Sequence, residues 1–310
     1  MTRLALKVDV DTLRGTREGV PTLVEMLRRH RLHATFLFSL GPDHTGRAIK
    51  RVFRPGFVGK VRRTSVVKHY GVRTLLYGTL LPGPDIGRRA ADVMQGVRDA
   101  GHETGIHCWD HIRWQDGVAE ADERWTHEEM SRACERYTEV FREPPRTHGA
   151  AGWQMNAHAL RLTQRLGFDY CSDGRGTHPH LPVFNAEPIR CPQFPTTLPT
   201  LDEMVGLEGV TEDNVAAHLL ERTREPAADQ VYTLHAELEG MRLAPQFEQL
   251  LLGWKAQGWT IGPVRASYES VEPMALPRCT TGPGTVPGRS GTLLVQGKEF
   301  LGEVDLAQAA

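Results

Sequence analysis

The sequence lacks the cysteine pattern of a disulfide framework or of a cysteine zinc site. Its five cysteines are odd in number, lie far apart, and include no Cys-x-x-Cys pair. Disulfide-rich domains and structural zinc sites both need paired or closely spaced cysteines. The pattern therefore argues against both classes, and a reducing compartment is the simplest expectation.

An excess of one charge and long hydrophobic runs are also missing. The chain has 37 basic and 38 acidic residues, so its net charge of −1 argues neither for nor against a nucleic-acid partner. No apolar run is long enough to cross a bilayer, and residues 4–8 are typical of a strand rather than of a signal peptide. These features predict a soluble or peripheral protein.

Strand-like and helix-like patterns alternate six or seven times along the chain. The predicted strands are short apolar runs separated by stretches of helical periodicity. They cover residues 4–10, 33–38, 168–172, 231–235 and 259–261. Such alternation is typical of a parallel α/β barrel or sheet. We expect one domain over residues 1–270, followed by a Pro/Gly-rich tail over 271–310. In that tail, 273–291 is expected to be a poorly ordered linker, and 292–304 could form a terminal hairpin.

Residues 41–84 interrupt the alternation after the second predicted strand. From Arg47 to Arg73 the sequence has nine basic residues and no acidic one, interleaved with apolar side chains. The basic residues are Arg47, Lys50, Arg51, Arg54, Lys60, Arg62, Arg63, Lys68 and Arg73. A solvated helical excursion would explain the charge alone, but cations mixed with aromatic and apolar side chains favour docking on an anionic membrane surface. Nothing else in the chain resembles a base-reading module, so no nucleic-acid partner is expected.

Residues 101–111 contain the candidate metal ligands His107 and His111. The two histidines stand four apart, so a helical turn would place both imidazoles on one side. Asp9 and Asp11, at the end of the first predicted strand, share one face and could supply an oxygen ligand. Asp110 could orient an imidazole through a hydrogen bond. Each motif alone is a weak signal, because histidine pairs arise by chance and Asp-x-Asp often caps a strand.

Three further polar residues follow predicted strands. Asp173 and Arg175 come after the strand at 168–172, and His235 ends the strand at 231–235. Barrel enzymes keep their chemistry at the carboxyl ends of their strands. These residues are therefore candidates for the same site, although Arg175 could equally be a surface arginine.

The combination of Asp9-x-Asp11, His107-x-x-x-His111 and a late His235 resembles the NodB-type polysaccharide deacetylases, a carbohydrate esterase family. The chain departs from the family pattern in three places. Its two aspartates are not adjacent, Leu234-His235 replaces Leu-x-His, and the sequence at 148–153 replaces the usual Arg-x-Pro motif.

Longer blocks resemble one branch of that family, the 4-deoxy-4-formamido-L-arabinose-phosphoundecaprenol deformylases. The blocks are 8–21, 150–153, 172–176, 197–200 and 232–240, so the resemblance covers roughly residues 4–270. It implies a distorted parallel (β/α)7-type barrel with a basic and apolar insertion after the second strand. It also implies removal of formate from an amino sugar carried on undecaprenyl phosphate. This reaction belongs to the bacterial pathway that adds aminoarabinose to lipid A and confers polymyxin resistance.

The same resemblance implies roles for the candidate residues. Asp11, His107 and His111 would hold a divalent metal, Zn²⁺ with Mn²⁺ or Co²⁺ as alternatives. Asp9 would be the base and His235 the acid, although Asp9 and Asp11 could exchange roles.

Three further residues would complete the site. Arg175 would pair with Asp9, Asp173 would be a further catalytic residue, and Trp153 would limit the size of the acyl pocket. The lipid-linked substrate would place the protein peripherally on the cytoplasmic face of the inner membrane. Two alternatives stay open: an N-deacetylase of a polysaccharide or another acylated amino sugar, and a non-catalytic lipid-sugar binding protein.

Overall fold

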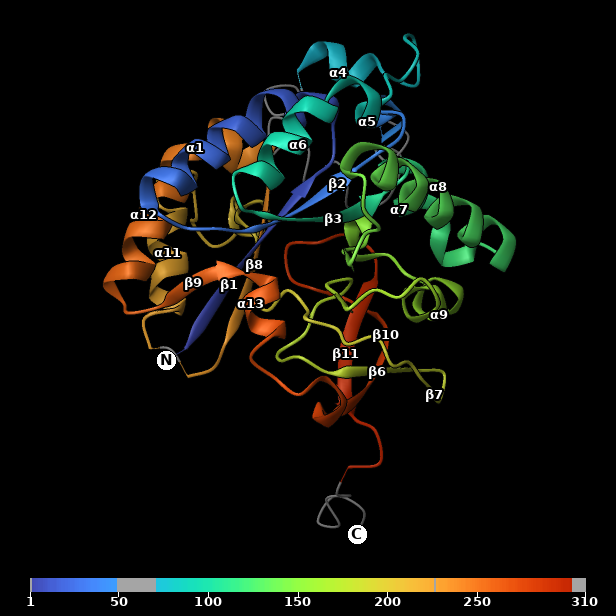
Figure 1. The fold of residues 1–310 in the computed structure, drawn as a ribbon. Coiled ribbons are helices and arrows are strands. Elements are labelled where there is room, and N and C mark those ends of the chain that lie inside the picture. Colours follow the sequence, from blue (N-terminus) through green and yellow to red (C-terminus); the bar gives the residue numbers. More distant parts are fainter. Residues whose placement is uncertain (1, 49–70, 226, 303–310) are drawn as a thin grey trace.

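A parallel sheet, curled into a half-barrel, forms the centre of the computed structural model, which describes residues 2–48, 71–225 and 227–302 (Figure 1). The strand order is β5-β4-β3-β2-β1-β8, and β9 also pairs with β1. The strands are β1 (Arg3–Val10), β2 (Thr35–Ser39), β3 (Glu103–Cys108), β4 (Thr147–His148), β5 (Tyr170–Cys171), β8 (Gln230–His235) and β9 (Thr260–Pro263). All their pairings are parallel. The predicted parallel α/β architecture is therefore confirmed.

Strand β1 is buried on both faces, and this determines where its charged residues lie. Leu4, Leu6, Val8 and Val10 join the large hydrophobic core. The alternate residues face the other side of the sheet, where Ala5 belongs to a small second cluster. Lys7 and Asp9 share that face and are 0% and 3% exposed. Buried charges need a partner, so β1 carries a polar site into the interior of the half-barrel.

Helices cover the outer face of the sheet (Figure 1). The longer ones are α1 (Val20–His30), α6 (Ala91–Asp99), α8 (Glu123–Phe141), α9 (Ala157–Arg165), α11 (Val215–Arg222) and α12 (Ala244–Ala256). Shorter ones are α4 (Val72–Leu76), α5 (Ile86–Arg89), α7 (His111–Gly117), α10 (Leu201–Met204) and α13 (Val264–Tyr268). Side-chain caps start several of them; for example, Asn156 accepts a hydrogen bond from the Ala159 amide at the start of α9.

A second sheet of four strands, in the order β11-β10-β6-β7, is built largely from the tail. Its strands are β6 (Leu181–Phe184), β7 (Glu187–Pro188), β10 (Arg278–Gly284) and β11 (Leu293–Glu299). Strand β10 lies inside the stretch expected to be a poorly ordered linker, so that expectation is wrong there. The hairpin predicted within 292–304 is also wrong. Strand β11 pairs antiparallel with β10, which lies outside that range.

Half of the insertion over 41–84, namely residues 49–70, lies outside the described residues. Of the predicted membrane-docking residues, Arg47 is described, and its Nε donates to the Gly78 carbonyl at 3.1 Å. Of the other basic residues of the insertion, Arg73 lies in α4, and seven lie within 49–70, outside the described part of the chain: Lys50, Arg51, Arg54, Lys60, Arg62, Arg63 and Lys68. Among the described residues, no helix combines the length and hydropathy needed to cross a membrane.

Candidate active site

The two histidines of the predicted metal pair come from different elements. His107 is in strand β3, and His111 is the first residue of helix α7. The single helical turn predicted for the pair is therefore wrong. A short connection between strand and helix nevertheless brings the two imidazole rings to 5.3 Å between centroids. The two rings are therefore close together, as expected, but they are held by a strand and the start of a helix rather than by one helical turn.

Asp11 lies between the two imidazoles. Its carboxylate oxygens are 3.3 Å from His107 Nε2 and 3.4 Å from His111 Nε2. One ligand atom from each of the three residues lies within 4.8 Å of the others. One carboxylate and two imidazoles are a donor set that suits Zn²⁺ and leaves room for further ligands. The residues present therefore fit the metal that the sequence predicts.

His107 is oriented by the backbone of the 149–153 loop. Its Nδ1 is 2.6 Å from the Gly149 carbonyl, so Nδ1 is the donor and Nε2 faces Asp11. Fixing the tautomer in this way is typical of metal-ligating histidines. Asp110, by contrast, is bonded to His44 Nδ1 at 2.6 Å and accepts from the Arg113 amide. The prediction that Asp110 orients one of the paired imidazoles is therefore wrong.

The neighbouring charges in this cluster shift the pKa values of Asp11 and His107. Burial opposes ionisation of Asp11, but His111, His107 and His235 outweigh it and hold the Asp11 pKa well below its usual range. Burial also disfavours the charged form of His107, yet Asp9 and Asp11 outweigh it and raise the His107 pKa. The imidazoles around Asp11 thus favour its ionised form. A divalent cation would take over that role once the imidazoles are neutral.

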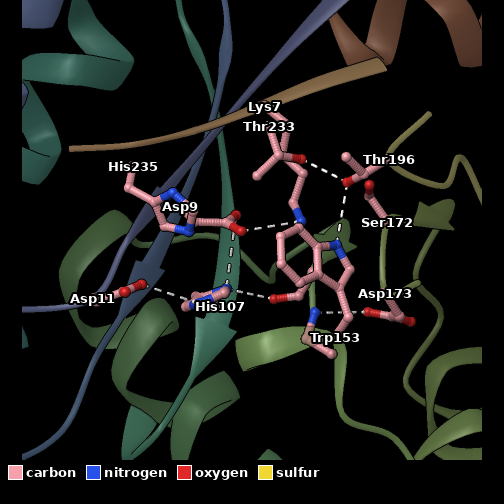
Figure 2. Close-up of polar contacts among 12 residues, drawn as sticks. Lys7, Asp9, Asp11, His107, Trp153, Ser172, Asp173, Thr196, Thr233 and His235 are labelled. Carbon is pink, nitrogen blue, oxygen red and sulfur yellow. Dashed lines mark hydrogen bonds and ion pairs between the residues drawn. The ribbon is translucent and has the colours of Figure 1, made fainter. Parts of the chain in front are cut away.

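Asp9 and His235 lie side by side at the end of two paired strands. They are register partners in the β1–β8 pair, so both side chains project from the same region of the sheet. Asp9 Oδ1 is 3.8 Å from His107 Nδ1, and His235 Nδ1 has no hydrogen-bond partner among the described residues. A potential base and a potential acid thus lie beside the candidate metal ligands, and Figure 2 shows Asp9 and His235 near Asp11 and His107.

The cation that pairs with Asp9 is Lys7. Its Nζ is 3.2 Å from Asp9 Oδ2, and both side chains are almost fully buried. The sequence-based interpretation missed Lys7, although residues two apart on a strand share a face. Arg175 was predicted in this role, and that prediction is wrong. Its Nη1 bonds Glu203 Oε1 at 2.6 Å, and its other nitrogens donate to the Thr196 and Leu198 carbonyls.

A second missed residue, Glu237, positions Asp11. Glu237 Oε1 accepts from the amides of Asp11 and Thr12 at 3.1 and 2.9 Å, and from the Thr12 hydroxyl. Burial and the nearby Asp11 charge raise the Glu237 pKa well above its usual range. The carboxyl end of β1 is therefore tied to the segment that follows His235. Glu237 follows His235 by two residues in the sequence, and this closeness could have indicated that Glu237 belongs to the site.

Asp173 supports the loop that carries Trp153. It is fully buried, and its carboxylate is bonded to His148 Nδ1 at 2.6 Å, the Ala150 amide at 3.0 Å and Gln193 Nε2 at 2.8 Å. His148, Asp173 and Cys171 also have ligand atoms within 4.8 Å of one another, entirely within the interior. The hydrogen bonds of Asp173 thus connect it to the 148–150 segment.

Trp153 lies beside Lys7 and His235 and is 2% exposed. Its φ of 54° is in the left-handed region, which non-glycine residues rarely occupy and which surrounding contacts must hold. Its Nε1 donates to Thr196 Oγ1 at 3.2 Å, and its ring meets His235 edge-on at 6.5 Å between centroids. Figure 2 shows the indole next to Lys7 and the Asp9 carboxylate.

Comparison with known proteins gives consistent matches. The family model described as polysaccharide deacetylase matches residues 4–171. A probable 4-deoxy-4-formamido-L-arabinose-phosphoundecaprenol deformylase, ArnD, of Shewanella sediminis is 39% identical over 252 residues, or 81% of each chain. A protein of the same description from Wigglesworthia glossinidia brevipalpis is 32% identical over 238 residues, 76% of this chain and 82% of its own.

Solved structures agree on the fold. A Mycobacterium smegmatis protein assigned to the polysaccharide deacetylases aligns with a TM-score of 0.60 at 18% identity, covering 89% of this chain and 91% of its own. The Xyl-CE4 domain of a multidomain xylanase from the hindgut metagenome of Trinervitermes trinervoides aligns with a TM-score of 0.50 at 12% identity, covering 89% and 94%. At such identities the likeness supports the shared fold alone.

Proposed function

The chain belongs to the polysaccharide deacetylase family, and on that premise we propose that it removes formate from 4-deoxy-4-formamido-L-arabinose-phosphoundecaprenol. Two relatives with 39% and 32% identity are described as deformylases of this lipid-linked sugar. The observation that carries the proposal is the convergence of Asp11, His107 and His111 beside Asp9 and His235. This arrangement suits hydrolysis of an amide, which needs an activated water, a stabilised oxyanion and a proton for the leaving amine.

The metal would be held by Asp11, His107 and His111. When bound, a divalent ion, Zn²⁺ with Mn²⁺ or Co²⁺ as alternatives, supplies Lewis-acid polarisation of the formyl carbonyl and lowers the pKa of a nearby water. The chain positions two of these three donors: Glu237 bonds the Asp11 amide, and the Gly149 carbonyl accepts from His107.

Asp9 is assigned as the general base and His235 as the general acid. Asp9 accepts a proton from the attacking water, and the buried Lys7 ammonium balances the Asp9 charge at 3.2 Å. His235 donates a proton to the sugar nitrogen as the C–N bond breaks, which releases formate and the free amine. The His235 ring suits this role because its Nδ1 has no partner among the described residues. Arg175 and Asp173 are assigned supporting roles, since their side chains bond Glu203 and His148.

The acyl group is tested with a matched pair of substrates. We expect the formamido lipid to be hydrolysed with a kcat/KM about 10- to 200-fold above that of its acetamido analogue, since one extra methyl group costs this much in a closed pocket. Formate and acetate release in detergent measures both reactions. Equal or faster release of acetate would support the N-deacetylase alternative. No release of either acid by metal-loaded protein would support the non-catalytic binding alternative.

Membrane docking follows from a substrate anchored in lipid. The described edge of the basic insertion exposes large apolar side chains, with Val72, Leu80 and Leu81 exposed by 66%, 81% and 38%. Apolar side chains next to a cationic stretch suit an anionic lipid surface. We therefore assign this region to peripheral docking on the cytoplasmic face of the bacterial inner membrane.

Vesicle binding measures this docking. We expect the protein to pellet with phosphatidylglycerol vesicles, less so as salt rises, and less still after Leu80→Ser and Leu81→Ser together or after removal of 47–81. Leu252→Ser is the matched control, because Leu252 is 56% exposed on α12, outside the insertion. Equal pelleting of the wild type, the double variant and the deletion would contradict the assignment.

A further inference from the structure

Arg289 lies in the connection between β10 and β11 and reaches the edge of the active site from the tail. Its Nε bonds Glu203 Oε1 at 2.8 Å, and its Nη2 is 3.7 Å from Asp202 Oδ2. Its guanidinium carbon is 4.4 Å from the centroid of the Trp153 ring. The side chain is 15% exposed, so the tail contributes a largely buried cation to a wall of the site.

Trp153 connects Arg289 to the surroundings of Asp9 and His235. Three cations contact its ring, with Arg175 at 5.1 Å and Lys7 at 5.5 Å in addition to Arg289. Lys7 is the partner of Asp9, and His235 meets the Trp153 ring edge-on. One indole thus touches the counter-charge of the base and the ring of the acid.

The backbone of the tail is fixed against the same region. The Arg175 amide donates to the Leu294 carbonyl at 2.9 Å, and the Gln296 amide donates to the Arg175 carbonyl at 2.8 Å. Gly288 has a φ of +81°, and a Cβ there would overlap the Glu203 carbonyl. Only glycine combines that conformation with so close an approach. These backbone contacts therefore place Arg289 next to Glu203.

We propose that Arg289 is a positioning residue of the deformylation site: it clamps Trp153 against Lys7 and His235, and so fixes the geometry of base and acid. The proposal rests on the proposed function for its kinetic consequence. Trp153 occupies a left-handed conformation, which neighbouring contacts must maintain. Arg175 contacts the same ring from a greater distance, 5.1 Å against 4.4 Å for Arg289, while its own nitrogens bond Glu203 and two carbonyls of the 196–198 segment. A guanidinium stacked on an indole supplies the missing restraint.

The test compares Arg289→Ala and Arg289→Lys with Arg278→Ala, a control in the same tail at an exposed position of β10. We expect Arg289→Ala to lower kcat on the formamido lipid on the order of 10- to 100-fold with little change in KM, because small misplacements of catalytic groups have this effect. Arg289→Lys keeps the cation and is expected to recover a substantial part of kcat. Arg278→Ala is expected to match the wild type.

A readout independent of turnover accompanies the kinetics. Acrylamide quenching assigned to Trp153, taken as the difference between each chain and its Trp153→Phe counterpart, is expected to rise in Arg289→Ala and to fall back in Arg289→Lys. Unchanged quenching together with unchanged kcat would overturn the proposal, as would equal losses in the alanine and lysine variants with equally lowered melting temperatures. If the wild type releases no formate but quenching rises as expected, the proposed function fails and the clamp on Trp153 stands.

Discussion

Asp11→Asn is expected to abolish metal binding and to lower formate release on the order of a thousandfold or more, because Lewis-acid activation contributes several kcal/mol to such hydrolyses. Asp11 is the only carboxylate of the candidate donor group, and its oxygens face both imidazoles at 3.3 and 3.4 Å. A neutral amide removes the negative charge that favours a divalent cation. Elemental analysis of purified protein, beside an assay of formate, measures both losses.

The control is a carboxylate of the same chemistry away from the site. Asp99→Asn alters an exposed residue at the end of α6 and is expected to keep the metal content and turnover of the wild type. An Asp11→Asn chain that holds one metal per chain and turns over at the wild-type rate would show that Asp11 is not a ligand.

Asp9→Asn is expected to keep the metal and to lose turnover by about 10²- to 10⁴-fold, the usual contribution of a general base. Asparagine has nearly the same shape but cannot accept the proton of the attacking water. The change also leaves Lys7 buried without its counter-charge, which costs about 3–5 kcal/mol when one partner of a buried pair is removed. Loss of activity must therefore be separated from loss of stability.

The double variant Asp9→Asn with Lys7→Met makes that separation. Methionine removes the uncompensated ammonium at a similar volume, so urea unfolding is expected to show recovered stability while formate release stays low. Metal content decides between the two aspartates. Metal-free Asp9→Asn with metal-replete Asp11→Asn would exchange the roles of base and ligand.

The sheet was predictable from the sequence because its signal is local. Strands β1, β2, β8 and β9 are short runs followed by a helical pattern, and they lie close to their predicted ranges, whereas β3 (Glu103–Cys108) and β4 (Thr147–His148) have no such apolar run. Asp9 and Asp11 were predictable for the same reason, since alternation along a strand determines which face a residue occupies. Lys7 obeys that rule too, yet a lysine in an apolar run resembles a surface residue until the second face of β1 is known to be buried.

Contacts between distant segments account for what could not be predicted. Arg175 was predicted to pair with Asp9 because it follows a strand. In the structure it instead bonds Glu203, a residue 28 positions later in the chain. Arg289 stands in a Pro/Gly-rich stretch with no periodicity, and only the pairing of β10 with β6 and β11 carries it to Trp153. Asp110 bonds His44, a residue 66 positions earlier in the chain. Such pairings depend on the folded backbone, and no spacing within either segment indicates them.

The central claim is that this chain hydrolyses the formamide of a lipid-linked amino sugar with a metal held by Asp11, His107 and His111. The most direct measurement is formate release from 4-deoxy-4-formamido-L-arabinose-phosphoundecaprenol by the purified full chain, before chelation, after chelation, and after Zn²⁺, Mn²⁺ or Co²⁺ is added back. We expect release to cease on chelation and to return with metal in the wild type but not in Asp11→Asn. Undiminished release from fully metal-depleted protein would contradict the account.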